Sequence, residues 1–327
     1  MALIGELNAT TEYYWAQTEP EDILNKASAL LWKLMGNAKA NDNWLVKPHE
    51  TVDGGLMIKV PLEYGAANSG SYGATTVINQ AKQTIVDAAR FPWSGIYGSQ
   101  TKNLDDLTQN SGEEAVINLT KIYINAIIKA ARTQMATQVI ATGTGDAIRG
   151  LGNLFNTTTS TEYGSIATDN MSTWTAKVIT TDDAISFEVM QKIWREPAMG
   201  SFKGMLPNFC CTTTKLRDGY ERTLHPQQIY KEASMVEAGW DNITHKGAPI
   251  VADPYYDTNL DGYLDALNLN FLSLRSHADY NFTTPVWASK EVLGQPDVMS
   301  ANTRWRGQLV CSNRRMHVRH NNLSEPA

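Results

Sequence analysis

The chain has 327 residues, of which 42% are hydrophobic and 19% are charged, and this composition excludes a disordered or histone-like protein. Its formal net charge of −6, from 28 Lys and Arg against 34 Asp and Glu, argues against a basic surface that grips nucleic acid. The length allows two packed regions, because a single core stops growing near about 250 residues.

Three cysteines, two of them adjacent (Cys210 and Cys211), cannot form a disulfide framework and indicate a reducing compartment. Residues 1–14 contain no basic segment followed by an apolar run and a cleavage site, so no secretory signal is predicted. We therefore expect the protein to stay in the cytoplasm in which it is made.

The first 50 residues are polar and irregular except for an amphipathic stretch, Ile23 to Met35, between Pro20 and Gly36. Two interpretations stay open at this point. The segment is either an arm that gains order on a neighbouring subunit or a plain surface helix at the edge of the core.

Residues 51–103 predict a long β-hairpin. Its first strand follows Gly54 and Gly55 and alternates Leu56, Ile58, Val60 and Leu62 with Met57, Lys59, Pro61 and Glu63, and its return strand is weaker and runs from Gln83 to Phe91. The tip between them is built of small residues and has too few contacts of its own to be stable alone, so we expect it to rest on another chain. The aromatic cluster that follows is either the attachment of the hairpin to its own body or an interface anchor: Phe91, Pro92, Trp93, Ile96 and Tyr97.

A single long helix is predicted from Gly112 to about Thr142, with Ser111 as N-cap and Gly143 as C-cap. Apolar residues cover most of its circumference, which predicts packing on more than one side. The polar residues recur at steps of three and four and argue against a membrane span: Glu114, Asn118, Lys121, Asn125, Lys129 and Arg132.

The helix is followed by the string TGTGDAIRGLGNL, Thr142 to Leu154. Its glycines do not have the spacing of a dinucleotide or phosphate-binding loop, and they follow a helix where such loops follow a strand. We interpret them as a turn out of the helix, with glycines at positive φ.

A second α/β region begins beyond residue 175. Thr181 or Asp182 is predicted to cap a helix that ends by Pro197 and Gly200, and a second helix is expected from Lys215 to about Thr223. Four strands are predicted: Met205 to Thr213, His245 to Pro254, Ala266 to Leu274, and Gln308 to Arg319 with Arg315, His317 and Arg319 on one face.

Motifs for catalysis are absent from the sequence: it has no G-x-S-x-G elbow and no phosphate-loop lysine. His317 and His320 have metal-ligand spacing but lack a Cys or acidic neighbour, which favours polar surface histidines. The best metal candidate is a calcium-like loop that lacks the final Glu and is followed by a strand, so an Asx-rich turn is favoured: Asp257, Asn259, Asp261, Gly262 and Asp265.

Arginines cluster near the end of the chain: Arg304, Arg306, Arg314, Arg315 and Arg319. They have two interpretations, packaged DNA or acidic partners across subunits, and the second is favoured because Arg pairs readily with carboxylates.

Taken in order, these stretches resemble the major capsid protein of tailed bacteriophages, whose shell fold also occurs in encapsulins and in the herpesvirus capsid floor. The layout that carries the resemblance covers nearly the whole chain: arm, glycine-tipped hairpin, long helix with its TGTGDAIRGLGNL turn, and the strands HKGAPIVADP, LNLNFLSL and QLVCSNRRMH. Gly247 and Pro249 before Asp253, and Asn313 with Arg314 and Arg315, look very much like the family.

The resemblance implies an α+β shell fold with four parts: an N-terminal arm at residues 1–50, an extended hairpin loop at 51–103, a peripheral domain at 104–155 and 281–327 built on the spine helix 112–142, and an axial domain at 156–280. It implies hexamers and pentamers that form an icosahedral shell in the virion, assembled in the host cytoplasm around double-stranded DNA that is contacted only non-specifically. Neither an enzymatic activity, a cofactor, a bound metal nor a membrane is expected.

Implied partners are a portal and a scaffolding protein, with a decoration protein as a further candidate. Because the arm begins almost at once at Met1, we expect the scaffold to be a separate chain. Some family members crosslink Lys to Asn between subunits; Lys59, Lys82 and Asn68 lie in the hairpin, but no crosslinking pair is matched.

Two alternatives compete. The first is an encapsulin-like compartment that encloses an enzyme. The second is a soluble hydrolase or a calcium-dependent binding module that uses Asp257 to Asp265.

Overall fold

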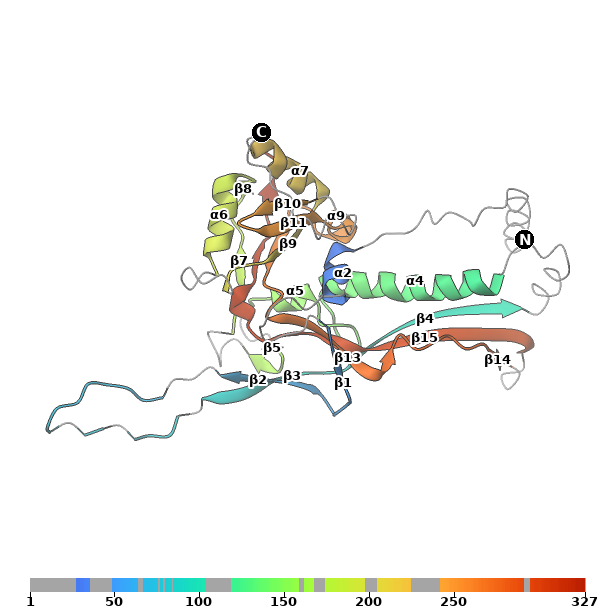
Figure 1. The fold of residues 1–327 in the computed structure, drawn as a ribbon, viewed down its shortest axis with the longest axis horizontal. Helices are drawn as coiled ribbons and strands as arrows, with labels where there is room; N and C mark the ends of the chain where they lie inside the picture. The colour runs from blue at the N-terminus through green and yellow to red at the C-terminus, as the bar shows by residue number, and fades with distance from the viewer. Residues whose placement is uncertain are drawn as a thin grey trace. The chain divides into compact units, whose positions relative to one another are not determined.

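The computed structural model describes residues 28–35, 49–63, 67–75, 77–78, 80–83, 85–103, 119–158, 162–167, 174–197, 205–224, 242–290 and 295–326 (Figure 1). The chain divides into two compact units. The first contains residues 1–26, 95–135 and 279–306, and the second contains 27–94, 136–278 and 307–327. Helices and strands mix in an α+β fold, as predicted.

The long helix α4 (Leu119–Ile140) runs along the strands β4 (Ser94–Asn103) and β15 (Gln295–Cys311) (Figure 1). Helix and strand meet at Gly98, where a Cβ atom would lie 2.3 Å from the carbonyl oxygen of Ile127. Only glycine leaves room for this approach. The sheet has the order β1-β13-β15-β14, with β4 also paired to β15; β1 is His49–Val52, β13 is Leu272–Asn281 and β14 is Ala288–Lys290.

The predicted spine helix is confirmed over its described part, since residues 112–118 lie outside the described ranges. It ends at Ile140, two residues before the predicted end. Its buried stripe is narrower than predicted, with Ile127, Ala131 and Met135 buried while Ala126 and Ala130 are exposed. Among the described residues, packing of α4 on several sides is therefore not found.

A six-stranded sheet lies in the second unit, in the order β10-β11-β9-β12-β16-β7. The strands are β7 (Lys177–Ile179), β9 (Phe209–Thr212), β10 (Asn242–His245), β11 (Ala248–Ala252), β12 (Leu264–Leu267) and β16 (Val318–His320). The pairs β11/β9 and β16/β7 are parallel, and the others are antiparallel. The central strands β9 and β12 are buried along their whole length, and Asp265 is the charged residue among their otherwise apolar or small side chains.

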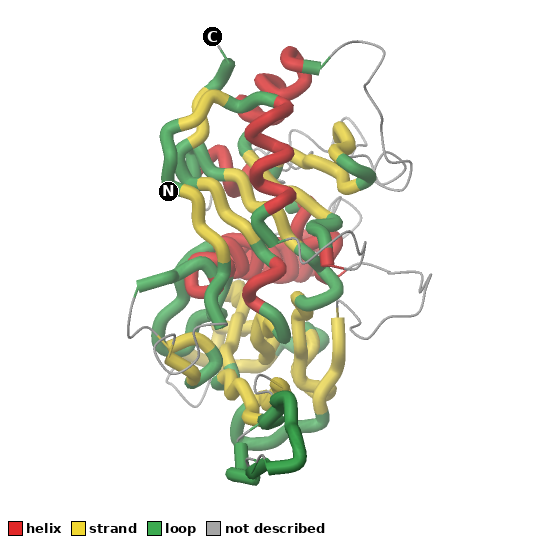
Figure 2. Tube along the Cα trace, turned by 90° about the vertical axis from the view of Figure 1, so that its left-hand side faces the viewer, coloured by secondary structure: helices red, strands yellow, loops and turns green. Residues whose placement is uncertain are grey.

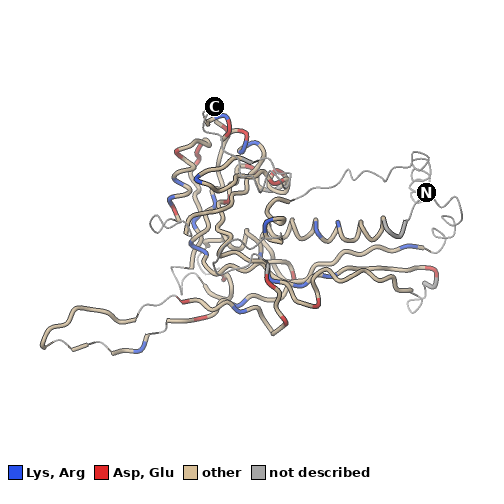
Figure 3. Tube along the Cα trace, in the orientation of Figure 1, with Lys and Arg blue, Asp and Glu red and all other residues tan. Residues whose placement is uncertain are grey.

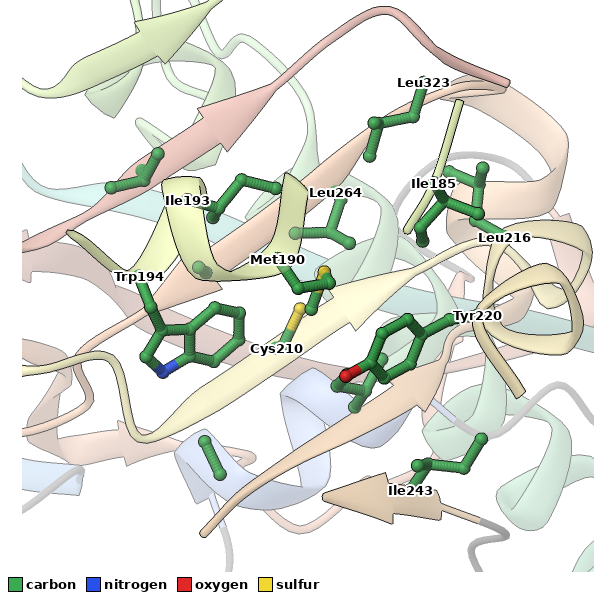
Figure 4. Close-up of a cluster of buried hydrophobic side chains, with 14 residues drawn as sticks. Ile185, Met190, Ile193, Trp194, Cys210, Leu216, Tyr220, Ile243, Leu264 and Leu323 are labelled. Atoms are coloured by element: carbon green, nitrogen blue, oxygen red, sulfur yellow. The ribbon is translucent and has the colours of Figure 1, made fainter. Parts of the chain in front are cut away.

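Helices α6 (Phe187–Arg195) and α7 (Thr214–Thr223) complete this core. Figure 4 shows Met190 and Ile193 of α6 and Tyr220 of α7 on the side of β9 that carries Cys210, and all four side chains belong to one buried cluster. Figure 2 shows α6 crossing in front of the strands. Helix α7 agrees with the predicted Lys215 to Thr223.

The predicted cap of α6 is wrong. Ser186 caps the helix, because its hydroxyl accepts from the Val189 N–H at 3.3 Å. The segment just after Thr181 and Asp182 is instead the short strand β8 (Asp183–Ala184), which pairs in parallel with β17 (Leu323–Ser324).

The single strand predicted from His245 to Pro254 is wrong. The structure has the end of β10, the strand β11 and the first residue of α9 in this segment. Lys246 and Gly247 have φ of 51° and 86°, and they form the two-residue turn between β10 and β11. Asp253 ends the strand segment and caps α9 (Pro254–Asn259) through the Tyr255 N–H at 3.0 Å.

The strand predicted from Ala266 to Leu274 is also wrong, because a turn separates β12 from β13. The side-chain oxygen of Asn268 accepts from the Asn270 N–H at 3.1 Å, and its carbonyl oxygen accepts from the Phe271 N–H at 3.1 Å. An asparagine that bonds to its own backbone in this way breaks the strand.

The strand predicted from Gln308 to Arg319 is three elements: the end of β15 at Cys311, a 3₁₀ turn at Arg314–Met316, and β16. The shared face predicted for Arg315, His317 and Arg319 therefore does not exist. The turn forms where the Arg314 side chain enters the core, as described below.

The glycine string after α4 is a turn, as predicted, that leads into the short helix α5 (Leu151–Leu154). Only Gly145 has positive φ, at 59°. Gly143 and Gly150 instead allow close packing, since a Cβ atom at either would lie within 2.5 Å of a backbone oxygen.

Within residues 23–35, the structure describes α2 (Ala29–Met35), and Ile23 to Ala27 lie outside the described ranges. Leu30 and Leu34 are fully buried, and the carboxylate of Asp253 accepts from the Ser28 hydroxyl at 2.6 Å and from the Leu30 N–H at 3.3 Å. The described part of this segment is therefore a helix at the edge of the chain's own core.

Candidate assembly surface

The hairpin consists of β2 (Ile58–Glu63) and β3 (Val86–Phe91), paired antiparallel with Ile58 opposite Phe91 and Glu63 opposite Val86. One face is buried in the chain itself and carries Ile58, Val60, Leu62, Ala89 and Phe91. The predicted alternation is confirmed from Ile58 onward. Leu56 is 92% exposed, so the strand begins later than predicted.

Beyond these strands the described residues of the hairpin are open to solvent. Tyr72, Val77 and Ile78 are large apolar side chains that nothing in the described chain covers, and Val77 is 93% exposed. Asn68 joins the two arms, because its amide donates to the Ala81 carbonyl oxygen at 2.6 Å and accepts from the Gln83 side chain at 2.9 Å. These exposed apolar residues make this part of the hairpin a candidate interaction surface.

Two side chains hold the start of the hairpin on its own body. The indole N–H of Trp93 donates to the Gly55 carbonyl oxygen at 2.8 Å, and its ring lies 5.5 Å from that of His277. Arg275 of β13 pairs with Glu50 at 2.9 Å and donates to the Lys59 carbonyl oxygen at 3.3 Å. Of the two interpretations of the aromatic cluster, attachment to the chain's own body holds for Trp93.

The tip of the small hairpin β5–β6 (Glu162–Tyr163 and Ile166–Ala167) supports β3 from the side. The Arg90 N–H donates to the Gly164 carbonyl oxygen at 2.7 Å, and the Ser165 hydroxyl donates to the Arg90 carbonyl oxygen at 3.3 Å. Gly164 has φ of 64°, and a Cβ atom there would lie 2.9 Å from the Cβ of Ala89 and 3.0 Å from the ring of Phe91. Glycine is required at this contact.

An aromatic column continues from this support into the core. The rings of Phe91 and Tyr163 meet edge to face at 5.2 Å, and the Trp174 indole N–H donates to the Tyr163 carbonyl oxygen at 2.9 Å. The Arg314 guanidinium lies 4.9 Å from the centre of the Tyr163 ring. Burial raises the pKa of Tyr163 and lowers that of Arg314.

Arg314 is fully buried, and its guanidinium donates to the carbonyl oxygens of Leu154, Asn156 and Trp174 at 2.6 to 3.0 Å. Arg319 makes a two-bond pair with Asp265 at 2.6 Å, across the β12–β16 register. Both proposed roles, DNA and acids across subunits, are therefore wrong for these two arginines. Arg304 and Arg306 are exposed.

The prediction of surface histidines is wrong. His317 and His320 are both fully buried. The His317 ring accepts from the Asn268 N–H at 3.2 Å and lies 3.4 Å from the Cys311 sulfur, while His320 lies 3.3 Å from the Asp183 carboxylate. Desolvation, with a smaller contribution from Arg314, lowers the pKa of His317 to about 3.

The acidic residues of the calcium-like loop do not converge on one point. Asp257 accepts from the Thr214 N–H and hydroxyl, each at 2.7 Å, at the start of α7. Asp261 is an exposed residue 3.9 Å from Lys215, and Asp265 is buried against Arg319. Within the described ranges, no three His, Cys, Asp or Glu side chains gather as metal ligands do.

The three cysteines are free and buried, and desolvation raises the pKa of each thiol. Among the described helices, none is long and apolar enough to cross a membrane. Figure 3 shows both signs of charge along the described chain, while the described part of α4 carries Lys and Arg and no Asp or Glu. The hairpin thus has an exposed apolar tip, with Tyr72, Val77 and Ile78, and a root, the strand pair β2–β3, that is held on the rest of the chain.

Solved structures that match this fold include phage capsids and an encapsulin. The cyanophage A-1(L) capsid matches over 94% of this chain and 96% of its own, with a TM-score of 0.70 and 14% identity. The capsid of Myoviridae phage XM1 matches over 93% and 95%, with a TM-score of 0.58 and 10% identity. The SrpI encapsulin of Synechococcus elongatus PCC 7942 matches over 95% and 98%, with a TM-score of 0.54 and 11% identity.

The fold is therefore the shell fold that tailed-phage capsid proteins share with encapsulins. No family model matches the sequence, and no curated protein does. These likenesses show the fold of the chain, in agreement with the predicted fold.

Proposed function

We propose that this chain is the major capsid protein of a tailed bacteriophage. It assembles into hexamers and pentamers, and these close an icosahedral shell around double-stranded DNA. The observation that supports this most is the match of nearly the whole chain, in both directions, to phage capsids. The exposed apolar tip of the hairpin adds to it, because such a surface is covered when copies associate.

In this proposal the parts have separate roles. Residues 104–155 and 281–327 form the peripheral domain on the spine helix, and residues 156–280 form the axial domain. Residues 51–103 reach over a neighbouring subunit, and residues 1–50 act as an arm. Many modest contacts of this kind close a shell that no single contact holds.

The proposal places the protein in the virion capsid, after assembly in the cytoplasm of the host. Portal and scaffolding proteins are its expected partners, with a decoration protein as a further candidate. Packaged DNA is contacted non-specifically, and the net charge of −6 suits a wall that does not hold phosphates tightly. We expect free subunits to show weak or no DNA binding at moderate salt, and tight binding would contradict this.

Negative-stain electron microscopy of the purified protein tests the proposal. Hexamers, pentamers, tubes or closed shells are the expected particles. A homogeneous population of compact monomers, at concentrations where capsid proteins assemble, would refute it.

The encapsulin-like compartment is the second candidate, supported by the match to the SrpI shell. The two proposals differ in what copurifies with the shell. A portal or scaffold protein would favour the phage capsid, and a cargo enzyme would favour the compartment.

A further inference from the structure

The outward face of the hairpin root carries an unusual pair of charges. In the β2–β3 register Lys59 stands directly opposite Arg90, and both side chains are exposed. Two steps further out, Pro61 stands opposite Ala88. Proline has no N–H, so Pro61 and Ala88 cannot form a hydrogen-bonded pair, and the alternation of the ladder makes Lys59 and Arg90 a non-hydrogen-bonded pair as well. In such pairs the side chains approach most closely.

The bonds of the two backbones agree with this arrangement. The N–H and carbonyl groups of Arg90 point away from β2 and bond to Gly164 and Ser165, and the Lys59 carbonyl oxygen bonds to Arg275. Like charges opposite each other on a sheet are destabilising. The described residues offer no carboxylate partner to either side chain in this chain.

The edges of the root are closed to another strand. On β2, Pro61 lacks a donor and the Lys59 carbonyl oxygen is occupied. On β3, the Asp87 carboxylate accepts from the Ala88 N–H at 2.7 Å, and both groups of Arg90 are occupied. Prolines and side chains that block an edge prevent strand addition. A neighbour can therefore meet this part of the hairpin only through its outward face.

We infer that the outward face around Lys59 and Arg90 is a docking surface for carboxylates of a second copy of this chain. The inference rests on the proposed function, in which the hairpin reaches a neighbouring subunit. Charge complementarity selects the occupant: two adjacent cations need acidic side chains, and a copy of this chain carries 34 Asp and Glu against 28 Lys and Arg. The inner face is not available, because the chain itself buries Ile58, Val60 and Phe91.

Duplex DNA fits this face less well than a protein surface does. The same outward face continues from Lys59 and Arg90 to Glu63, which stands opposite the exposed apolar residue Val86. A polyanion is held by a row of cations. Two cations followed by a carboxylate and an apolar side chain match the mixed surface of a protein.

The test is the double charge reversal Lys59→Glu/Arg90→Glu in purified subunits, with assembly followed by light scattering and electron microscopy. The matched control is Lys59→Arg/Arg90→Lys, which keeps both charges at the same positions. We expect the reversal to raise the subunit concentration needed for assembly at least about tenfold and the control to change it little. Raising the ionic strength from about 0.1 M to about 1 M, which shortens the Debye length from roughly 10 Å to 3 Å, should weaken wild-type assembly in the same direction.

Thermal unfolding of unassembled subunits serves as the control for correct folding. The melting temperatures of both variants should stay within about 2 °C of wild type because the side chains are exposed. If the wild type and the charge-reversal variant assemble at the same subunit concentration, the inference is overturned and the proposed function still stands. An absence of particles from wild type would overturn both. Retardation of a DNA duplex by wild-type subunits that the reversal abolishes would assign the face to nucleic acid and overturn the inference.

Discussion

The buried pair of Arg319 and Asp265 supports the sharpest stability prediction. Arg319 of β16 faces Asp265 of the neighbouring strand β12. Their side-chain exposures are 8% and 0%, and two hydrogen bonds of 2.6 Å join them. The Tyr256 hydroxyl also donates to Asp265. Burial alone would lower the pKa of Arg319, but the adjacent Asp265 outweighs it, and the net direction is upward. The arginine therefore stays charged in the core.

The perturbation is Arg319→Met, which removes the cation and leaves Asp265 with Tyr256 as its remaining side-chain partner. A buried charge left without its counter-ion costs about 3 to 5 kcal/mol of unfolding free energy. For a unit of this size that corresponds to a fall in melting temperature of about 6 to 20 °C. Urea unfolding of unassembled subunits, followed by circular dichroism, measures the free energy directly.

The control is the double variant Arg319→Met/Asp265→Leu, which removes both charges and fills the same space. Apolar replacement of a whole buried pair is often neutral or stabilising, so the double variant should recover part of the loss, and the remainder is the cost of the Tyr256 hydroxyl that loses its acceptor. A single variant that loses less than about 1 kcal/mol would refute the reasoning. A double variant no more stable than the single one would also contradict it.

Three further predictions concern the supports of the fold. Gly164→Val should loosen the hairpin root by about 1 to 3 kcal/mol and speed proteolysis there, whereas Gly145→Ala, also at positive φ but in open space, should leave the hairpin intact. In the unfolded chain His317 binds a proton below its ordinary pKa of about 6.5, but in the folded chain its pKa is about 3. The free energy of unfolding should therefore fall as the pH drops below about 6.5, by about 2 kcal/mol at pH 5. His317→Gln should flatten this dependence of the unfolding free energy on pH, measured by urea titration at several pH values. Asp253→Ala removes the cap of α9 and the carboxylate that holds Ser28 and the Leu30 N–H of α2, and it should cost about 2 kcal/mol by thermal unfolding. Ser28→Ala removes the bonds to Asp253 and to the Leu31 N–H but leaves the cap of α9, so it should cost less.

Local patterns predict those elements whose partners lie nearby in the chain. The alternation of Ile58, Val60 and Leu62 depends only on pairing with the facing strand β3, so the sequence pattern predicts it correctly. The helix α7, predicted at Lys215 to Thr223, has its capping residue, Thr213, directly before it. The failures lie where a side chain bonds to its own backbone. The Leu and Asn alternation of residues 266–274 fits one strand as well as two, and only the bonds of Asn268 decide between them.

Side chains whose partners are distant in sequence could not be placed from spacing alone. His320 is buried against Asp183, 137 residues away, and Arg314 bonds to Leu154, 160 residues away. Nothing within a few residues of either position signals that partner. The supports of the hairpin were missed for the same reason, although a glycine at residue 164 in a short polar stretch between two β-forming pairs is a signal for a tight turn.

One physical rule connects the buried arginines to the exposed charges of the hairpin. A cation placed in the core is found with acceptors that match it, three carbonyl groups for Arg314 and a carboxylate for Arg319. Lys59 and Arg90 stand close together without a carboxylate partner among the described residues, on a strand pair whose edges are already occupied. Folding of one copy leaves this repulsion in place, and a partner that brings carboxylates removes it. The same segment is therefore expected to be stable at its root in a free subunit and to gain the acceptors for its outward face only when copies associate.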